Sequence, residues 1–185
     1  MKKKREEIRK RILDSALGEF LEKGFEDATT RGLAGAAGVS YGNMYKYFSG
    51  KEDILDGVMG TYAASNHRRF LEVLEHRHGE GAVDFGAEGI IAGFVSMFRE
   101  SRSRFIVFFT KMRGARLDRY REGMVAIMRG HMEEVIGNEL LADVFTSNLV
   151  SSVMRFAREY VDADAFEGAV RLYLRYHFAG VRGIR

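Results

Sequence analysis

The sequence contains no cysteine and no proline, and each absence removes a class of structure. Without cysteine there is no disulfide framework, no thiolate metal site and no cysteine nucleophile. The absence of proline is typical of helices joined by short connections, because proline interrupts helices. Long apolar runs are also missing, since the run from Phe105 to Phe109 is far shorter than the about 20 residues that a membrane-spanning helix needs. The lysine-rich start precedes an amphipathic segment and not an apolar signal core, so we expect a soluble, cytoplasmic protein with no membrane partner.

Catalytic motifs are missing as well. The sequence has no HExxH, GxSxG, Walker or dinucleotide-binding fingerprint. Its five histidines are scattered, and His76 and His78 would point to different faces of a helix. Acidic pairs such as Glu133 and Glu134 are adjacent and would not face one site. We therefore expect no enzyme, with no catalytic residues, no cofactor and no metal.

The composition is that of a folded chain with an uneven charge distribution. Hydrophobic residues make up 46% and charged residues 30%, which excludes an extended disordered chain. Residues 1–51 carry 11 Lys/Arg against 7 Asp/Glu, a net charge of +4, whereas the remaining residues carry 18 against 19, a net charge of −1. This asymmetry places a polyanionic partner at the N-terminal end.

The segment Thr29–Lys51 indicates two short helices joined by a glycine-containing turn, which is the layout of a helix-turn-helix DNA reader. Thr29 can cap the first helix and Ser40 the second. Met44 and Phe48 are four residues apart and should face inward on a helix that runs from residue 41 to residue 48. The outward face would carry groups that suit phosphates and base edges, with a glycine that lets the backbone approach DNA: Tyr41, Gly42, Asn43, Tyr45, Lys46 and Tyr47.

The block from Arg9 to Val58 resembles the N-terminal domain of TetR-family transcriptional repressors. The matching motifs are IRKRILDSALGEFLEKGFEDATT, then AGVSYGNMYKYF, then KEDIL at the start of a long fourth helix. Each motif alone is weak, but the ordered set is specific, and it covers roughly the first third of the chain. The rest of the chain is similar to the family only in length and helical character.

The resemblance implies roles for single residues of the helix-turn-helix. It implies phosphate contacts for Thr29, Tyr45, Tyr47 and Lys51, and contacts with bases or nearby phosphates for Tyr41, Asn43 and Lys46. From the residues alone, the tyrosines could instead belong to the core, and Lys46 could be only a solvated side chain. The run Lys2–Arg5 is either a disordered tail or an arm that follows phosphates or enters the minor groove.

Helical spacing continues through the rest of the chain, and no alternating strand pattern competes with it. We expect helices from Lys51 to a break near Gly79 and Gly81, and then at Ala82–Glu100, Arg104–Arg113, Leu117–Ile136, Leu140–Asp162 and Ala165–Val181. The predicted fold is therefore all-α, with about nine helices. We place a three-helix DNA-binding domain at residues 1–50 and a helical effector-binding and dimerisation domain at residues 51–185.

The helices of the second domain carry two sets of candidate residues. Aromatic and methionine side chains in the middle helices can line an apolar pocket, or they can simply form a core. The resemblance implies a ligand cavity here, and the predicted ligand-binding residues are Phe94, Phe98, Phe105, Phe109, Met112 and Met128.

The last two helices have wide apolar stripes that can bury against their own chain or a second copy; the resemblance implies a four-helix bundle between two subunits. The predicted dimerisation residues are Leu149, Val153, Phe156, Val170, Leu174 and Phe178.

These expectations combine into one functional hypothesis. The sequence predicts a homodimeric transcriptional regulator, a repressor whose hold on a double-stranded DNA operator is weakened by a small apolar effector. The alternative is a DNA-binding dimer without such an effector, controlled by a protein partner or by its abundance.

Overall fold

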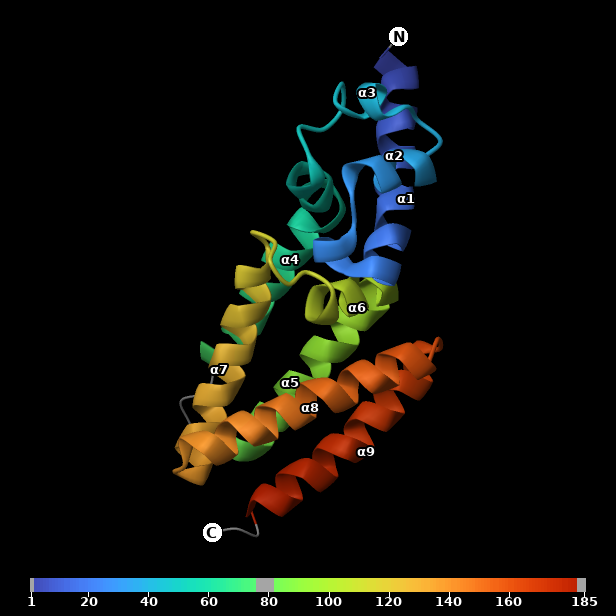
Figure 1. Cartoon of the computed structure of the whole chain (residues 1–185). Helices are drawn as coiled ribbons and strands as arrows, with labels where there is room; N and C mark the ends of the chain where they lie inside the picture. The colour runs from blue at the N-terminus through green and yellow to red at the C-terminus, as the bar shows by residue number, and fades with distance from the viewer. Residues whose placement is uncertain (1, 76–81, 183–185) are drawn as a thin grey trace.

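The computed structural model describes residues 2–75 and 82–182, and over these residues the chain is all-α (Figure 1). The N-terminal helices lie at one end of an elongated molecule and the last two helices at the other. The helices of the described residues are α1 (Lys2–Asp27), α2 (Thr30–Ala36), α3 (Tyr41–Met44), α4 (Lys51–Glu75), α5 (Ala82–Glu100), α6 (Arg102–Thr110), α7 (Asp118–Ile136), α8 (Glu139–Glu159) and α9 (Ala163–Arg182). The all-α fold predicted from the sequence is confirmed.

The helix boundaries after α4 lie within three residues of those predicted, and side-chain caps fix two of the N-terminal boundaries. Helix α6 begins at Arg102, two residues earlier than expected, because the Ser101 hydroxyl accepts a hydrogen bond from the Arg104 amide. Asn138 caps α8 in the same way, through the amide of Leu141. The break expected near residues 79 and 81 lies outside the described residues.

Helix α1 begins at Lys2, so the Lys2–Arg5 run forms its first turn and is not a disordered tail. Gly24 has a φ of 83° and a ψ of 171°, which interrupts the helix with a kink. A φ of this sign is easily adopted only by glycine, and the last residues of α1 therefore turn toward α6.

The second helix of the helix-turn-helix is shorter than expected. It was predicted to run from residue 41 to residue 48, but α3 ends at Met44. The Lys46 amide donates to the Asn43 carbonyl and the Tyr47 amide to the Met44 carbonyl, so the chain continues as a tight turn with three-residue spacing, and the Phe48 amide then also donates to the Met44 carbonyl. Phe48 is still buried, as its four-residue spacing from Met44 predicted.

One hydrophobic core extends through both ends of the molecule. In the N-terminal part, Ile12, Phe20, Leu33 and Met44 are fully buried. Helix α4 approaches α1 closely at Gly57, where an added Cβ would lie 2.7 Å from a Leu13 methyl carbon. Helix α4 then continues between α5 and α7, so a single helix joins the N-terminal part to the rest. Among the described residues, none of the helices combines the length and apolar character that crossing a bilayer requires.

Candidate nucleic-acid interface and effector cleft

Two helix caps define the geometry of the helix-turn-helix. The Thr29 hydroxyl accepts a hydrogen bond from the Gly32 amide at 3.0 Å, and the Ser40 hydroxyl accepts one from the Asn43 amide at 3.3 Å. Gly38, with a φ of 64°, forms the turn between the two helices. Both capping residues are exposed at the surface, so these two predicted DNA-binding residues position α2 and α3 while remaining accessible.

Tyr41 and Tyr45 lie on the surface and not in the core, with 45% and 47% of each residue exposed. Their rings meet edge to face at 5.2 Å, and their hydroxyl oxygens are 3.0 Å apart. The hydrogen bond with Tyr45 raises the pKa of Tyr41, so its hydroxyl keeps its proton at neutral pH. The pair therefore presents two hydroxyl groups to solvent on the outer side of α3.

The guanidinium of Arg31, on α2, lies 5.5 Å from the centre of the Tyr41 ring. Arg31 is exposed and adds a positive charge beside the two hydroxyl groups. Arg31 was not among the DNA-binding residues predicted from the sequence. Its position could have indicated it, because it follows the cap Thr29 by two residues and does not belong to the apolar stripe of α2.

The other predicted contact residues of this segment differ in exposure. Gly42 and Lys46 are exposed, whereas Asn43 and Tyr47 are half-buried, and Tyr47 packs against the core. An added Cβ at Gly42 would meet nothing within 4 Å, so the packing of the chain itself does not require a glycine there. The segment thus leaves open space above its backbone where a partner can approach.

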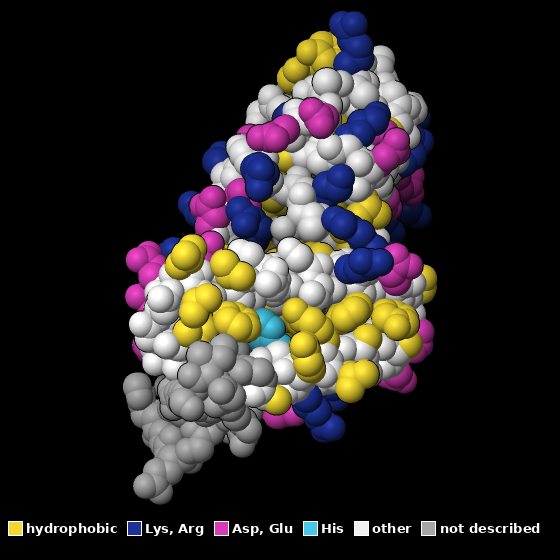
Figure 2. Space-filling model, turned by 60° about the horizontal axis from the view of Figure 1, so that its bottom comes forward, with side chains coloured by type: hydrophobic (Ala, Val, Ile, Leu, Met, Phe, Trp, Pro, Cys, Tyr) yellow, Lys and Arg dark blue, Asp and Glu magenta, His cyan; other side chains and the backbone are white. Residues whose placement is uncertain are grey.

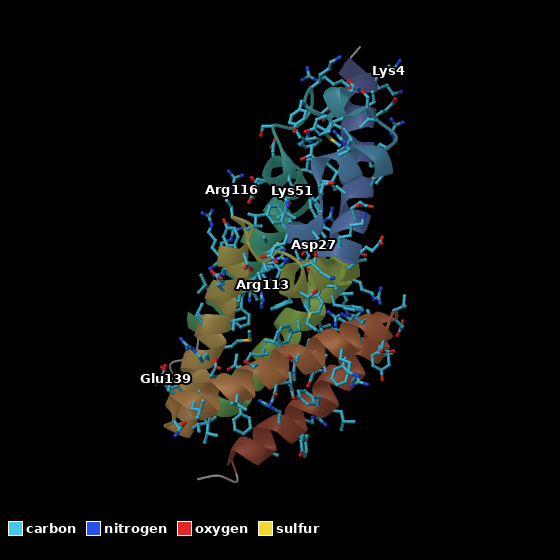
Figure 3. The ribbon with its side chains drawn as sticks, in the orientation of Figure 1. Lys4, Asp27, Lys51, Arg113, Arg116 and Glu139 are labelled. Carbon is cyan, nitrogen blue, oxygen red and sulfur yellow. The ribbon has the colours of Figure 1, made fainter. Side chains whose placement is uncertain are left out.

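Lys51 is tied to the end of α1 (Figure 3). Its ammonium donates hydrogen bonds to the Phe25 carbonyl at 2.6 Å and to the Glu26 carbonyl at 3.1 Å, and it lies 4.3 Å from the centre of the Phe25 ring. These contacts satisfy carbonyl oxygens that the end of a helix leaves without intrahelical partners. Two of the three N–H donors of this predicted phosphate contact are therefore engaged within the chain.

The connection between α6 and α7 joins the N-terminal helices to the body. The Phe25 amide donates to the Lys111 carbonyl at 2.8 Å, and the Lys111 ammonium donates to the Glu22 carbonyl at 3.2 Å. Arg116 pairs with Asp56 and Glu52 on the first turns of α4 (Figure 3). A shift of this connection would therefore act on α1 and α4 together.

The six predicted ligand-binding residues pack into the core. Phe94, Phe98, Phe105, Phe109, Met112 and Met128 are each at most 6% exposed. Phe105 has the rings of Phe94, Phe98, Phe109 and Phe166 around it, with centroid distances of 5.2 to 6.1 Å. The structure brings the phenylalanines together, but as a filled cluster.

A cleft of about 660 Å³ lies elsewhere, between α4 and α5. Its walls are mainly apolar or small side chains, and its rim carries charged groups. The lining residues are Asn66, Arg69, Phe70, Glu72, Glu88, Gly89, Ala92, Gly93, Ser96 and Met97. The rim is held by the ion pairs Arg69–Glu100 at 3.2 Å and Arg171–Glu88 at 2.6 Å. None of the six predicted ligand-binding residues lines this cleft, because sequence periodicity cannot show where two helices stand apart.

Most of the predicted dimerisation residues are buried within their own chain. Leu149, Val153, Val170 and Leu174 are at most 1% exposed, because they lie where α8 and α9 pack against the rest of the body and against each other. Phe156 is half-buried beside Tyr173, and the side chain of Phe178 lies outside the described residues.

The outer faces of the last two helices carry a second apolar set. Its most exposed members on α8 and α9 are Leu140, Leu141, Val144, Leu172 and Tyr176. Figure 2 shows hydrophobic side chains gathered in a band across the end of the molecule that α8 and α9 form. His177 packs against the rings of Phe145 and Tyr173, and burial lowers its pKa, so it is neutral at pH 7.

The N-terminal helices match a known family. Residues 12–58 match the family model described as bacterial regulatory proteins, tetR family. The chain is similar to the HTH-type transcriptional regulator SrpR of Pseudomonas putida, with 43% identity over 56 residues, which are 30% of this chain and 26% of that protein. It is also similar to the uncharacterized HTH-type transcriptional regulator YdgC of Bacillus subtilis (strain 168), with 33% identity over 92 residues, 50% of this chain and 47% of that protein. The chain thus aligns with less than half the length of these curated relatives.

Solved structures extend the likeness to the whole fold. A TetR-family transcriptional regulator from Bordetella parapertussis 12822 superposes with a TM-score of 0.65 and 21% identity, covering 90% of this chain and 93% of that one. FadR from Bacillus subtilis, solved in complex with stearoyl-CoA, superposes with a TM-score of 0.56 and 21% identity, covering 89% and 96%. Residues 12–58 thus carry the helix-turn-helix region of the tetR family model, and the chain shares the all-α fold of solved TetR-family transcriptional regulators.

Proposed function

We propose that the protein is a homodimeric repressor that binds an operator through its two helix-turn-helix segments and is released by a small apolar ligand. In this proposal residues 1–50 form the DNA-binding domain, and residues 51–185 bind the effector and form the dimer. The observation that carries it is the exposed group on α2 and α3, in which Arg31, Tyr41 and Tyr45 lie together beside Gly42. Hydroxyl and guanidinium groups of this kind suit phosphate oxygens and base edges.

The exposed apolar faces of the last two helices support a dimeric mode of binding. A helix-turn-helix reader that recognises paired half-sites needs two heads about 34 to 36 Å apart. The apolar outer faces of α8 and α9 supply a surface for a second copy, since Leu172 and Tyr176 are 74% and 78% exposed in the single chain. Apolar side chains on two adjacent helices can form a four-helix bundle with the same faces of a partner.

The cleft between α4 and α5 is the effector site in this proposal. FadR of Bacillus subtilis was solved with stearoyl-CoA, a ligand with a long apolar chain, and the apolar walls of the cleft suit a ligand of that character. Helix α4 runs from the cleft to Lys51, so a ligand that shifts α4 would move the DNA-binding helices. Release requires that the ligand binds the DNA-incompetent arrangement more tightly, with a coupling of about 1 to 3 kcal/mol.

Removal of the Tyr45 hydroxyl group tests the DNA-binding part of the proposal. Tyr45→Phe keeps the ring that packs on Tyr41 and removes one hydrogen-bonding group from each head of the dimer. Because a hydrogen bond contributes about 0.5 to 1.5 kcal/mol, we expect the dimer to lose about 5- to 150-fold in operator affinity. Fluorescence anisotropy with a labelled operator measures the change. Tyr160→Phe, at the far end of the molecule, is the matched control and should bind as the wild type does; equal affinity of Tyr45→Phe would refute the role of α3.

Filling the cleft tests the effector site. Ala92 lines the cleft and is exposed, so Ala92→Phe should occupy the space without disturbing the core. We expect this variant to keep its operator affinity and to lose the rise in melting temperature that an apolar ligand gives the wild type. Stearoyl-CoA and 1-decanol serve as probes in a thermal-shift assay, and Ala126→Phe, on the exposed side of α7, is the control. An undiminished rise in the Ala92→Phe variant would place the ligand elsewhere.

A further inference from the structure

The first turns of α1 are a separate feature of the N-terminal end. Residues 2–11 precede the segment that matches the tetR family model, which begins at residue 12. They are helical, and at 1.5 Å per residue they extend α1 by about 15 Å. They carry seven Lys/Arg against two Asp/Glu, a net charge of +5, which exceeds the +3 of the whole chain. The highest density of positive charge therefore lies on a helix at the tip of the molecule.

Two arginines hold this helix against the segment that follows α3. The Arg5 guanidinium donates a hydrogen bond to the Lys46 carbonyl at 3.3 Å, across 41 positions of sequence. The Arg9 guanidinium lies 5.1 Å from the centre of the Phe48 ring. Arg5 and Arg9 are four residues apart, so both contacts come from one side of α1. The start of α1 is thus fixed beside α3, as Figure 1 shows.

Two neighbouring lysines at the start of α1 are exposed and can bind a partner molecule. Lys3 and Lys4 are exposed, and within the described part of the chain no carboxylate lies at ion-pair distance from either ammonium. Figure 3 shows Lys4 at the tip of the molecule, at the same end as α3. Like charges held together without counter-charges favour binding of a polyanion.

We propose that the first turns of α1 form a second, rigid DNA contact, in which Lys3 and Lys4 bind backbone phosphates beside the groove that α3 enters. This inference rests on the proposed function. A helix is about 10 to 12 Å across with its side chains and does not fit a minor groove about 6 Å wide, so the segment stays outside the groove. It therefore adds affinity and salt dependence without reading base sequence.

The test is the salt dependence of operator binding by a Lys3→Gln/Lys4→Gln variant of the full chain. Each lost phosphate contact reduces the slope of log affinity against log salt by about 0.9. We expect the slope for the dimer to fall by about 1.8 if one lysine of each head contacts DNA and by about 3.6 if both do. The control variant Arg68→Gln/Arg129→Gln removes two charges from helices of the body and should leave the slope unchanged. Operator selection with each variant shows whether base preference changes.

The outcomes separate this inference from the proposal on which it rests. A smaller slope with the same selected sequence supports phosphate contacts by α1. An unchanged slope, with wild-type operator binding intact, overturns the inference and leaves the proposed function standing. Loss of a preference for A·T pairs beside the half-site would indicate minor-groove reading and would also overturn it. If the wild type selects no sequence at all, the proposed function itself fails.

Discussion

Replacing Phe105 with alanine should lower the free energy of unfolding by about 3 to 5 kcal/mol. Phe105 is fully buried, and four phenylalanine rings surround it, so the substitution removes apolar contacts and leaves a cavity that its neighbours cannot fill. Urea denaturation followed by circular dichroism measures the loss. A large loss is expected only of a filled core; a cluster that opens to hold a ligand would be packed more loosely.

A matched substitution controls for the change of side-chain type. Val161→Ala also truncates an apolar residue, but Val161 is 77% exposed, so its effect should stay within about 0.5 kcal/mol. If Phe105→Ala costs no more than this control, the cluster does not stabilise the fold as described. That result would instead favour the prediction from the sequence that Phe94, Phe98, Phe105 and Phe109 line a ligand pocket.

Lys51→Ala should reduce both stability and operator affinity. Removing the ammonium takes the donor from the partly buried Phe25 carbonyl and from the exposed Glu26 carbonyl, which water can then reach, so we expect a loss of about 0.5 to 1.5 kcal/mol. The remaining N–H of Lys51 is available to a phosphate. We therefore also expect the salt slope of operator binding by the dimer to fall by about 1.8, which corresponds to one contact from each head.

The two effects of Lys51 have different readouts and can be separated. Lys23→Ala removes an exposed lysine of the same region, which pairs with Glu19, and should change stability little. A loss of stability with an unchanged slope would assign Lys51 to holding α1 against α4 only. Unchanged stability would contradict the contacts with the end of α1.

The helices could be predicted because their evidence is local. Apolar spacing and capping residues such as Thr29 and Ser40 lie within a few positions of each other, and the structure forms the helices that they indicate. The length of α3 could not be predicted in this way. Phe48 keeps a helical spacing from Met44 even though the chain between them is a tight turn, so the apolar pattern is the same for both conformations.

What the sequence missed depends on contacts between distant segments. The Arg5 contact with Lys46 spans 41 positions, and the Lys51 contacts with Phe25 and Glu26 span 26 and 25. The stripe through Leu149 and Val153 correctly indicated an apolar face of α8, but a stripe does not say whether its own chain or a second copy covers it. The position of the cleft likewise depends on how far α4 and α5 stand apart.

The central claim is that α3 and its exposed tyrosines meet duplex DNA, and selection from a pool of random duplexes tests it most directly. The wild-type protein should enrich a paired half-site whose centres are about 10 base pairs, or a multiple of that spacing, apart. Recovery of no preferred sequence, with binding as weak as to random DNA, would contradict the account.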